Sequence, residues 1–109
     1  MTDTMIKTSH GEKRLAQIGI TEKIAKVILN EISPRIHHDH LVYLVTNRAI
    51  ERMLKNRVIN VSEAKKMHQL MLIASTERFI ITAYHPNKKK WKNMMRLPTV
   101  NSLRGRNIS

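Results

Sequence analysis

Two short aliphatic segments limit the fold of this chain more than any other feature. They are residues 70–75 and 79–84, and only the polar residues Thr76, Glu77 and Arg78 separate them. Each has the length and the β-branched or aromatic content of a strand. The pair predicts an antiparallel hairpin, although its turn lacks the usual Asn-Gly signal.

Helix signals occupy the first third of the chain. Ser9 followed by Glu12 forms a capping-box pattern, which predicts the start of a first helix, and Gly19 predicts its end. Thr21 predicts the cap of a second helix, with apolar residues at helical spacing behind it. Pro34 limits that helix, because the residue before a proline is pushed out of the α region.

A strand and two more helices follow. Residues 41–45 are a β-branched and aromatic run that predicts a buried strand. From Asn47 the spacing becomes helical, with a face that extends to Arg57, and Asn60 followed by Glu63 is a second capping-box pattern. The expected order is ααβααββ. This is an α+β fold in which two helical pairs pack on a small antiparallel sheet.

The composition fits one such domain. The chain has 109 residues, of which 41% are hydrophobic, and its lack of Cys excludes disulfides and thiol chemistry. We expect residues 1–8 to be a flexible lead-in, residues 9–87 to form the domain and residues 88–109 to form a basic tail. No apolar run approaches the roughly 18 residues of a membrane span. We therefore expect a cytoplasmic location and no membrane partner.

Positive charge dominates the chain, with 20 Lys and Arg against 8 Asp and Glu. No acidic residue follows Glu77. Such a field favours nucleic acid as the partner, with RNA expected and DNA as the alternative. The tail is either solvated and disordered or an arm that follows phosphates while its tryptophan stacks on a base. The residues of that arm would be Lys88, Lys89, Lys90, Trp91 and Lys92.

Four residues are candidates for chemistry on phosphate. His10 and Arg14 stand four apart, so a helix presents them on one face. Thr82 and Tyr84 share one face of a strand, and His85 follows them. Imidazole moves protons near neutral pH, and guanidinium holds phosphate oxygens in a bidentate manner. The candidate catalytic residues His10, Arg14, Thr82 and His85 converge with Tyr84 if the strand end meets the first helix. Taken singly, each also fits an ordinary surface or strand position.

His37, His38 and His40 raise the question of a metal site. The chain supplies no Cys, and no Glu stands at ligand spacing to complete the set. Exposed imidazoles in a loop that leads into a strand are the better explanation. We expect neither a metal nor a cofactor.

Several motifs resemble an uncharacterised family of small bacterial and phage proteins. They are His10-x-x-x-Arg14 with Gly19-Ile-Thr behind it, residues 42–50, and Ile-Ile-Thr-Ala-Tyr at Ile80–Tyr84. That family is similar to the RelE, barnase and colicin D group of metal-independent ribonucleases and toxins. The resemblance implies a helical pair on a curved antiparallel sheet, with RNA lying across the sheet. One position departs from the family pattern, because Ile18 replaces its arginine.

Two functions remain open from the sequence. The resemblance implies an endoribonuclease in which the ribose 2′-hydroxyl attacks the adjacent phosphate, accompanied in the cell by an acidic neutralising protein. The alternative is a non-catalytic basic accessory protein of a phage or mobile element, which binds nucleic acid or a host protein. The charge, the basic tail and the missing cation at Ile18 favour this alternative.

Overall fold

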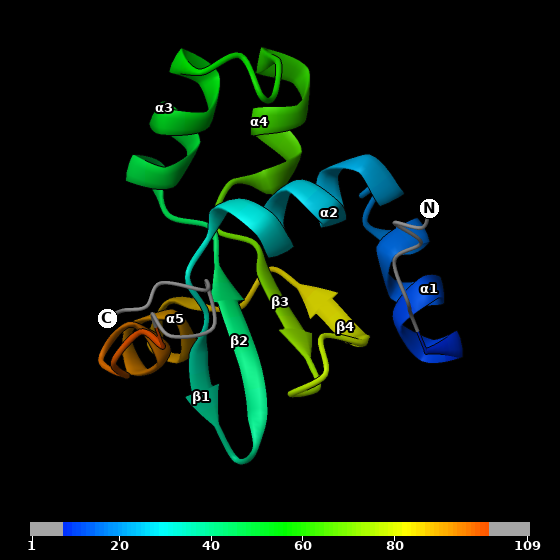
Figure 1. The fold of residues 1–109 in the computed structure, drawn as a ribbon, viewed down its shortest axis with the longest axis vertical. Helices are drawn as coiled ribbons and strands as arrows, with labels where there is room; N and C mark the ends of the chain where they lie inside the picture. The colour runs from blue at the N-terminus through cyan, green and yellow to red at the C-terminus, as the bar shows by residue number, and fades with distance from the viewer. Residues whose placement is uncertain (1–7, 101–109) are drawn as a thin grey trace.

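The computed structural model describes residues 8–100, in which five helices and four strands form an α+β fold (Figure 1). The sequence-based prediction of this class is confirmed. In chain order the elements are α1 (Ser9–Gln17), α2 (Glu22–Glu31), β1 (Arg35–His37), β2 (His40–Leu44), α3 (Asn47–Lys55), α4 (Val61–Met67), β3 (Met71–Ala74), β4 (Ile80–Tyr84) and α5 (Lys88–Met95).

The four strands form one antiparallel sheet in the order β1-β2-β3-β4. The hairpin predicted from residues 70–84 is present, with Leu72 opposite Ala83 and an irregular register between Ile73 and Ala74. The chain leaves the sheet after β2 as the α3–α4 pair and returns as β3, its neighbour. The helical pair therefore projects beyond the ends of the central strands (Figure 1).

Strand β1 was not predicted from the sequence. It pairs with β2 through the two-residue turn His38-Asp39, whose φ angles of 50° and 66° are both left-handed. Two left-handed residues make the type I′ hairpin turn, which matches the twist of the strands it joins. The expectation of a loop before the strand is thus wrong, because His37 and His40 lie opposite each other in paired strands. His-Asp is an uncommon sequence for such a turn.

The larger of two apolar cores lies on the sheet face covered by α2. Ile24 and Ile28 of α2 pack there with Tyr43 of β2 and Leu72 of β3, and Met53 of α3 closes the far end. All five are at most 1% exposed. The spacing of Ile24 and Ile28 on one helical face, and the alternation along the strands, direct these residues inward.

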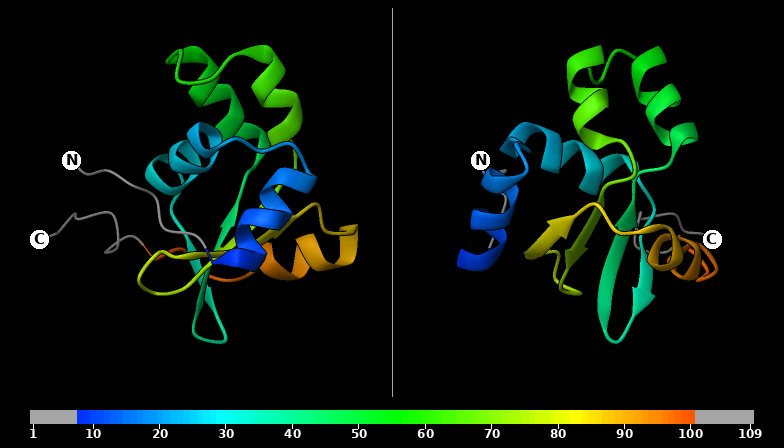
Figure 2. Two further views of the ribbon diagram at one scale, coloured as in Figure 1. Left: turned by 90° about the vertical axis from the view of Figure 1, so that its right-hand side faces the viewer. Right: turned by 180° about the vertical axis from the view of Figure 1, so that it is seen from behind.

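The smaller core lies on the opposite face, under α5. Val42, Leu44 and Met71 alternate with the residues of the first core, and Met94 of α5 packs over them. Figure 2 shows α2 and α5 on opposite sides of the sheet. The fold is therefore a sheet between two unequal helical layers.

Helix α1 lies along β4 and is tied to its first residue. The backbone N–H and the hydroxyl of Thr8 both donate to the carbonyl oxygen of Ile80, at 3.0 and 3.2 Å. The Thr8 Oγ1 also accepts from the N–H of Gly11, so Thr8 is the N-cap. The predicted cap at Ser9 is wrong by one residue. Thr8 was expected in a flexible lead-in but is anchored, and residues 1–7 lie outside the described chain.

The other helix boundaries follow local signals. Gly19 ends α1 with a left-handed φ of 74°, and the Thr21 hydroxyl caps α2. Asn60 and Glu63 form the reciprocal capping box at the start of α4, with bonds of 2.8 and 2.9 Å. Helix α3 is shorter than predicted. It ends two residues before Arg57, whose φ of 60° is not helical.

Residues after Asn87 form a helix where the sequence predicted a tail. The Asn87 side chain caps α5 by accepting from the N–H of Lys90 at 2.8 Å. Trp91 and Met94 are three apart, so they share the helix face that packs on the sheet. Four of the five residues from Lys88 to Lys92 are lysines, so the composition of this segment predicts a solvated tail although the segment contains part of an apolar helix face.

The end of α5 is fastened to β1. Arg35 donates from Nη1 to the carbonyl oxygens of Met95, at 3.1 Å, and Leu97. Further on, the N–H of Val100 donates to the Pro34 carbonyl at 2.7 Å. The domain end expected near Asn87 therefore lies at least as far as residue 100. Residues 101–109, which complete the predicted tail, are outside the described chain.

Candidate nucleic-acid interface

Thr82 and Tyr84 belong to the sheet face on which α5 lies. Tyr84 is opposite Met71 and Thr82 is opposite Ile73, and three of these four residues contribute to the core under α5. Helix α5 packs mainly on β2, and β3 lies between β2 and β4 in the sheet. Ile73, Thr82 and Tyr84 therefore remain only half-buried.

Helix α5 adds an aromatic ring and cations to this face. Trp91 packs half-buried against the smaller core. Lys88, Lys89 and Lys92 are exposed, and Lys90 is half-buried. We call this surface the α5 sheet face. It consists of Thr82, Tyr84, Lys88, Lys89, Lys90, Trp91 and Lys92.

The α5 sheet face has the composition of a polyanion-binding surface. The four strands and α5 contain no acidic residue. The carboxylates nearest to the strands in sequence, Asp39 and Glu77, lie in the two hairpin turns. Partial burial raises the pKa of Tyr84, so its hydroxyl remains a hydrogen-bond donor at neutral pH. Lysines can neutralise phosphates, and aromatic rings can stack on bases of any identity.

His10 and Arg14 lie on α1, beside β4 and away from α5 (Figures 1 and 2). His10 is exposed, and the Arg14 Nη1 donates to the Gln17 Oε1 at 3.0 Å. Because Thr8, the N-cap of α1, is hydrogen-bonded to Ile80, His10 is near the first residue of β4. Thr82 extends from the same strand toward the α5 side. The start of α1 therefore lies at the beginning of β4 and not at its end, so the predicted convergence of His10 with His85 is not found.

His85 lies beyond the other end of β4. From Ile80 to His85 an extended chain covers about 16 Å, so the strand separates His85 from the start of α1. The Nδ1 of His85 lies 3.1 Å from the carbonyl oxygen of His68, which can only accept. Nδ1 therefore carries a proton and donates it. In the neutral ring this leaves Nε2 as the acceptor, a form suited to a general base.

The structure adds Arg35 and His37 to the residues that the sequence indicated. Arg35 is opposite Val42, which faces α5, and His37 is two residues further along the same strand. Both therefore share the face of Thr82. The sequence carried little signal for this strand, because His38-Asp39 is not one of the residue pairs typical of a type I′ turn.

A separate groove of about 540 Å³ lies on the α3–α4 pair. None of its lining residues belongs to the α5 sheet face. One of them, His68, accepts the hydrogen bond from His85 through its carbonyl oxygen. Val61 at its margin is 64% exposed, the largest value among the exposed large hydrophobic residues described. The lining residues are Asn47, Ile50, Glu51, Val61, Ala64, Lys65 and His68.

Between residues 8 and 100, no three His, Asp or Glu side chains are grouped so that they could hold a metal ion. No helix in the same range has the length and apolar character needed to cross a membrane.

Comparisons of the chain with protein-family models, with curated proteins and with solved structures found no match. The functional assignment therefore depends on the geometry of the α5 sheet face and on the motifs in the sequence.

Proposed function

We propose that the protein binds RNA across the α5 sheet face, in the manner of the ribonuclease-toxin group that its motifs resemble. The observation that carries the proposal is the packing of α5. Its apolar side meets the sheet, which puts Trp91 and four lysines on the same face as Thr82 and Tyr84. A sheet face with two aromatic rings, hydroxyl donors and flanking cations matches what single-stranded RNA requires.

The contributions of these groups differ in kind. Each stacked base contributes about 1–3 kcal/mol, and Tyr84 and Trp91 can each serve one base. The lysines act through phosphate, and each contact should contribute about 0.7 to the slope of log K against log salt. The hydroxyl of Thr82 can bond a ribose 2′-hydroxyl, which DNA lacks.

A lysine substitution series with a matched control tests the proposal. Lys88, Lys89 and Lys92 changed together to Gln should weaken binding of a labelled oligouridine at least tenfold. The salt slope should fall by about 2, because three phosphate contacts are lost. The control changes Lys13, Lys55 and Lys66, three exposed lysines on α1, α3 and α4, to Gln. Equal loss in both triple variants would show that affinity follows net charge alone.

We propose RNA cleavage without a metal as the second candidate function. The observation that favours it is the close attachment of α1 to β4, which holds His10 and Arg14 beside the strand that carries Thr82. The ribose 2′-oxygen would lose its proton to an imidazole and bond to the adjacent phosphorus. The bond from phosphorus to the 5′-oxygen would break, and that oxygen would receive a proton. The products are a 2′,3′-cyclic phosphate and a free 5′-hydroxyl.

The roles in this reaction follow from position. Because β4 separates His85 from the start of α1, the two imidazoles are alternative bases: exposed His10, with Arg14 on the same helix to hold phosphoryl oxygens, or His85, whose Nε2 can accept a proton. His10→Ala or His85→Ala should reduce cleavage about 10²-fold or more, with no effect of EDTA. RNA that stays intact while it binds would leave the non-catalytic accessory protein of a phage or mobile element as the function. Growth arrest by the wild-type protein, relieved by a co-expressed acidic partner protein, would support the toxin.

A further inference from the structure

The tip of the β1–β2 hairpin carries three histidines within four residues. The rings of His37 and His38 have their centroids 4.0 Å apart, tilted by 56°. His40 is the cross-strand partner of His37, so their side chains leave the same face of the sheet as neighbours. That face is the one on which α5 lies, as shown for Arg35 on the same strand.

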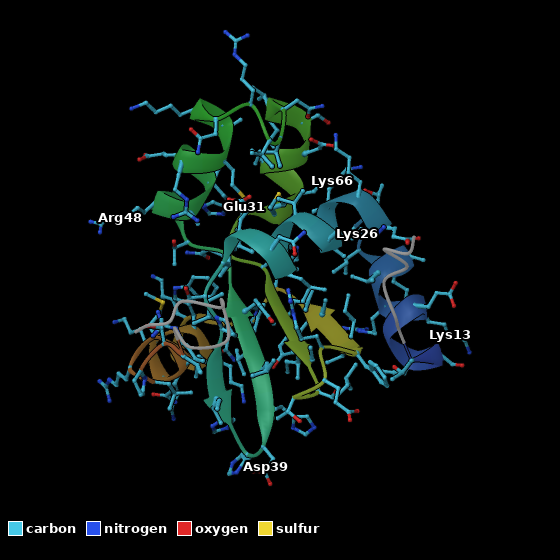
Figure 3. The ribbon with its side chains drawn as sticks, viewed as in Figure 1. Lys13, Lys26, Glu31, Asp39, Arg48 and Lys66 are labelled. Carbon is cyan, nitrogen blue, oxygen red and sulfur yellow. The ribbon has the colours of Figure 1, made fainter. Side chains whose placement is uncertain are left out.

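The charges around this cluster are mostly positive. Burial lowers the pKa of His37, and the charges of His38, Lys90 and His40 lower it further. Lys90 comes from α5, Arg35 from β1, and the turn adds the carboxylate of Asp39, which Figure 3 shows at the extreme tip. Among the charged residues of the hairpin and of α5, Asp39 is thus the one carboxylate, against the cations Arg35 and Lys90 and the three imidazoles.

We propose that His37, His38 and His40, together with Lys90, form a second phosphate site for the same RNA, so that binding takes up protons. This inference rests on the proposed function. It extends the RNA path from the lysines of α5 onto the hairpin, through Lys90, which belongs to both groups. A protonated imidazole donates from both ring nitrogens, and a phosphate offers several acceptor oxygens.

The coupling has a definite sign. In the free protein, burial and the neighbouring positive charges oppose protonation of His37. A phosphate bound beside the imidazoles would offset those positive charges and favour the protonated form. Binding must therefore strengthen as the pH falls. The expected change is up to tenfold per pH unit for about one proton taken up.

The experiment measures affinity and proton uptake with one probe, a fluorescein-labelled oligouridine of about 12 nucleotides. Anisotropy titrations would run from about pH 5.5 to pH 8 at constant ionic strength, which spans the ordinary imidazole range. Calorimetry in two buffers of different ionisation enthalpy counts the protons. The variant changes His37, His38 and His40 to Gln together. For a matched single change, His37→Gln is compared with His68→Gln at the C-cap of α4.

The inference predicts that the wild type takes up about one proton or more near pH 6.5. The triple variant should lose this uptake, bind at least tenfold more weakly near pH 5.5 and bind almost normally near pH 8. His68→Gln should keep the wild-type pH dependence, and His37→Gln should lose part of it.

Two other results would be decisive against it. Equal pH slopes in the wild type and the triple variant would overturn the hairpin site, while RNA binding as such would stand. A wild type that binds no RNA at any pH would overturn the proposed function and the hairpin site together. Circular dichroism of the triple variant confirms that any loss arises in the folded state.

Discussion

Gly11→Ala would add one carbon at the tightest contact between α1 and the sheet. A Cβ at this position would lie 2.4 Å from the carbonyl oxygen of Ile80 and 3.0 Å from its carbonyl carbon. Both neighbours are backbone atoms of a strand that is paired on its other side, so they cannot rotate away. Ordinary contact begins near 3.4 Å. Helix α1 must therefore move outward by about 1 Å, a shift that a packed interior transmits to neighbouring contacts.

The cost follows from what this shift removes. It stretches the two hydrogen bonds from Thr8 to Ile80, each worth about 0.5–1.5 kcal/mol. It also withdraws Leu15, which is 4% exposed, from the core, and loss of part of its packing costs about 1–2 kcal/mol. Alanine regains at most about 1 kcal/mol over glycine through helix propensity. The net expectation is a loss of about 2 kcal/mol.

Urea unfolding followed by circular dichroism measures this difference. Thr8→Ala should cost about 1–2 kcal/mol, because Thr8 is the N-cap, whereas Ser9→Ala should change stability by less than about 0.5 kcal/mol. Ser9→Ala is thus the matched control within the same turn. A Gly11→Ala protein that is more stable than the wild type by about 1 kcal/mol would show that propensity alone acts, and would refute the close packing of α1 on β4.

Three further predictions concern stability. The N–H of Asn60 and the ammonium of Lys23 lower the pKa of Glu63 from its unfolded value of 4.5. The stabilisation from the Glu63 carboxylate should therefore be complete above about pH 4.5 and should disappear as the pH falls through the lowered pKa. Melting curves of Glu63→Gln should lack this acid-dependent part. Burial raises the pKa of Tyr43 against the opposing effect of Arg78, so stability should decline as the pH rises above about 10, and less steeply in Tyr43→Phe. Arg35→Lys should loosen the end of α5 by about 1–2 kcal/mol, because a point charge cannot hold two carbonyls as the planar fork does. Faster hydrogen exchange in α5 alone would report it, and unchanged exchange there would argue against the clamp.

The features that sequence analysis predicted are local. The capping box of Asn60 and Glu63 and the glycine stop at Gly19 each involve residues a few positions apart. The β3–β4 hairpin likewise depends on two adjacent segments. Such signals need no knowledge of the rest of the chain.

The features that it missed depend on distant contacts. Helix α5 forms where four lysines suggest a tail, because Trp91 and Met94 find an apolar sheet face and Arg35 holds the far end. Strand β1 has only three residues and is stabilised by its pairing with β2. The cap at Thr8 is preferred over Ser9 because only Thr8 also reaches Ile80.

The candidate site shows the same division. Alternation correctly places Thr82 and Tyr84 on one face. The sequence could not show which helix meets that face, and the structure places α5 there, with α1 at the neighbouring strand edge. That His37 and His40 lie on the same face could be seen only from the register of β1 with β2.

Trp91 provides the most direct test of RNA binding on the α5 sheet face, because it is the only tryptophan in the chain. Its indole fluorescence should be quenched as oligouridine is added, since a base stacks on the ring or lies against it. The account predicts a quenching curve with the same midpoint as the anisotropy of the labelled RNA. Complete binding by anisotropy with unchanged Trp91 fluorescence would place the RNA elsewhere and contradict the account.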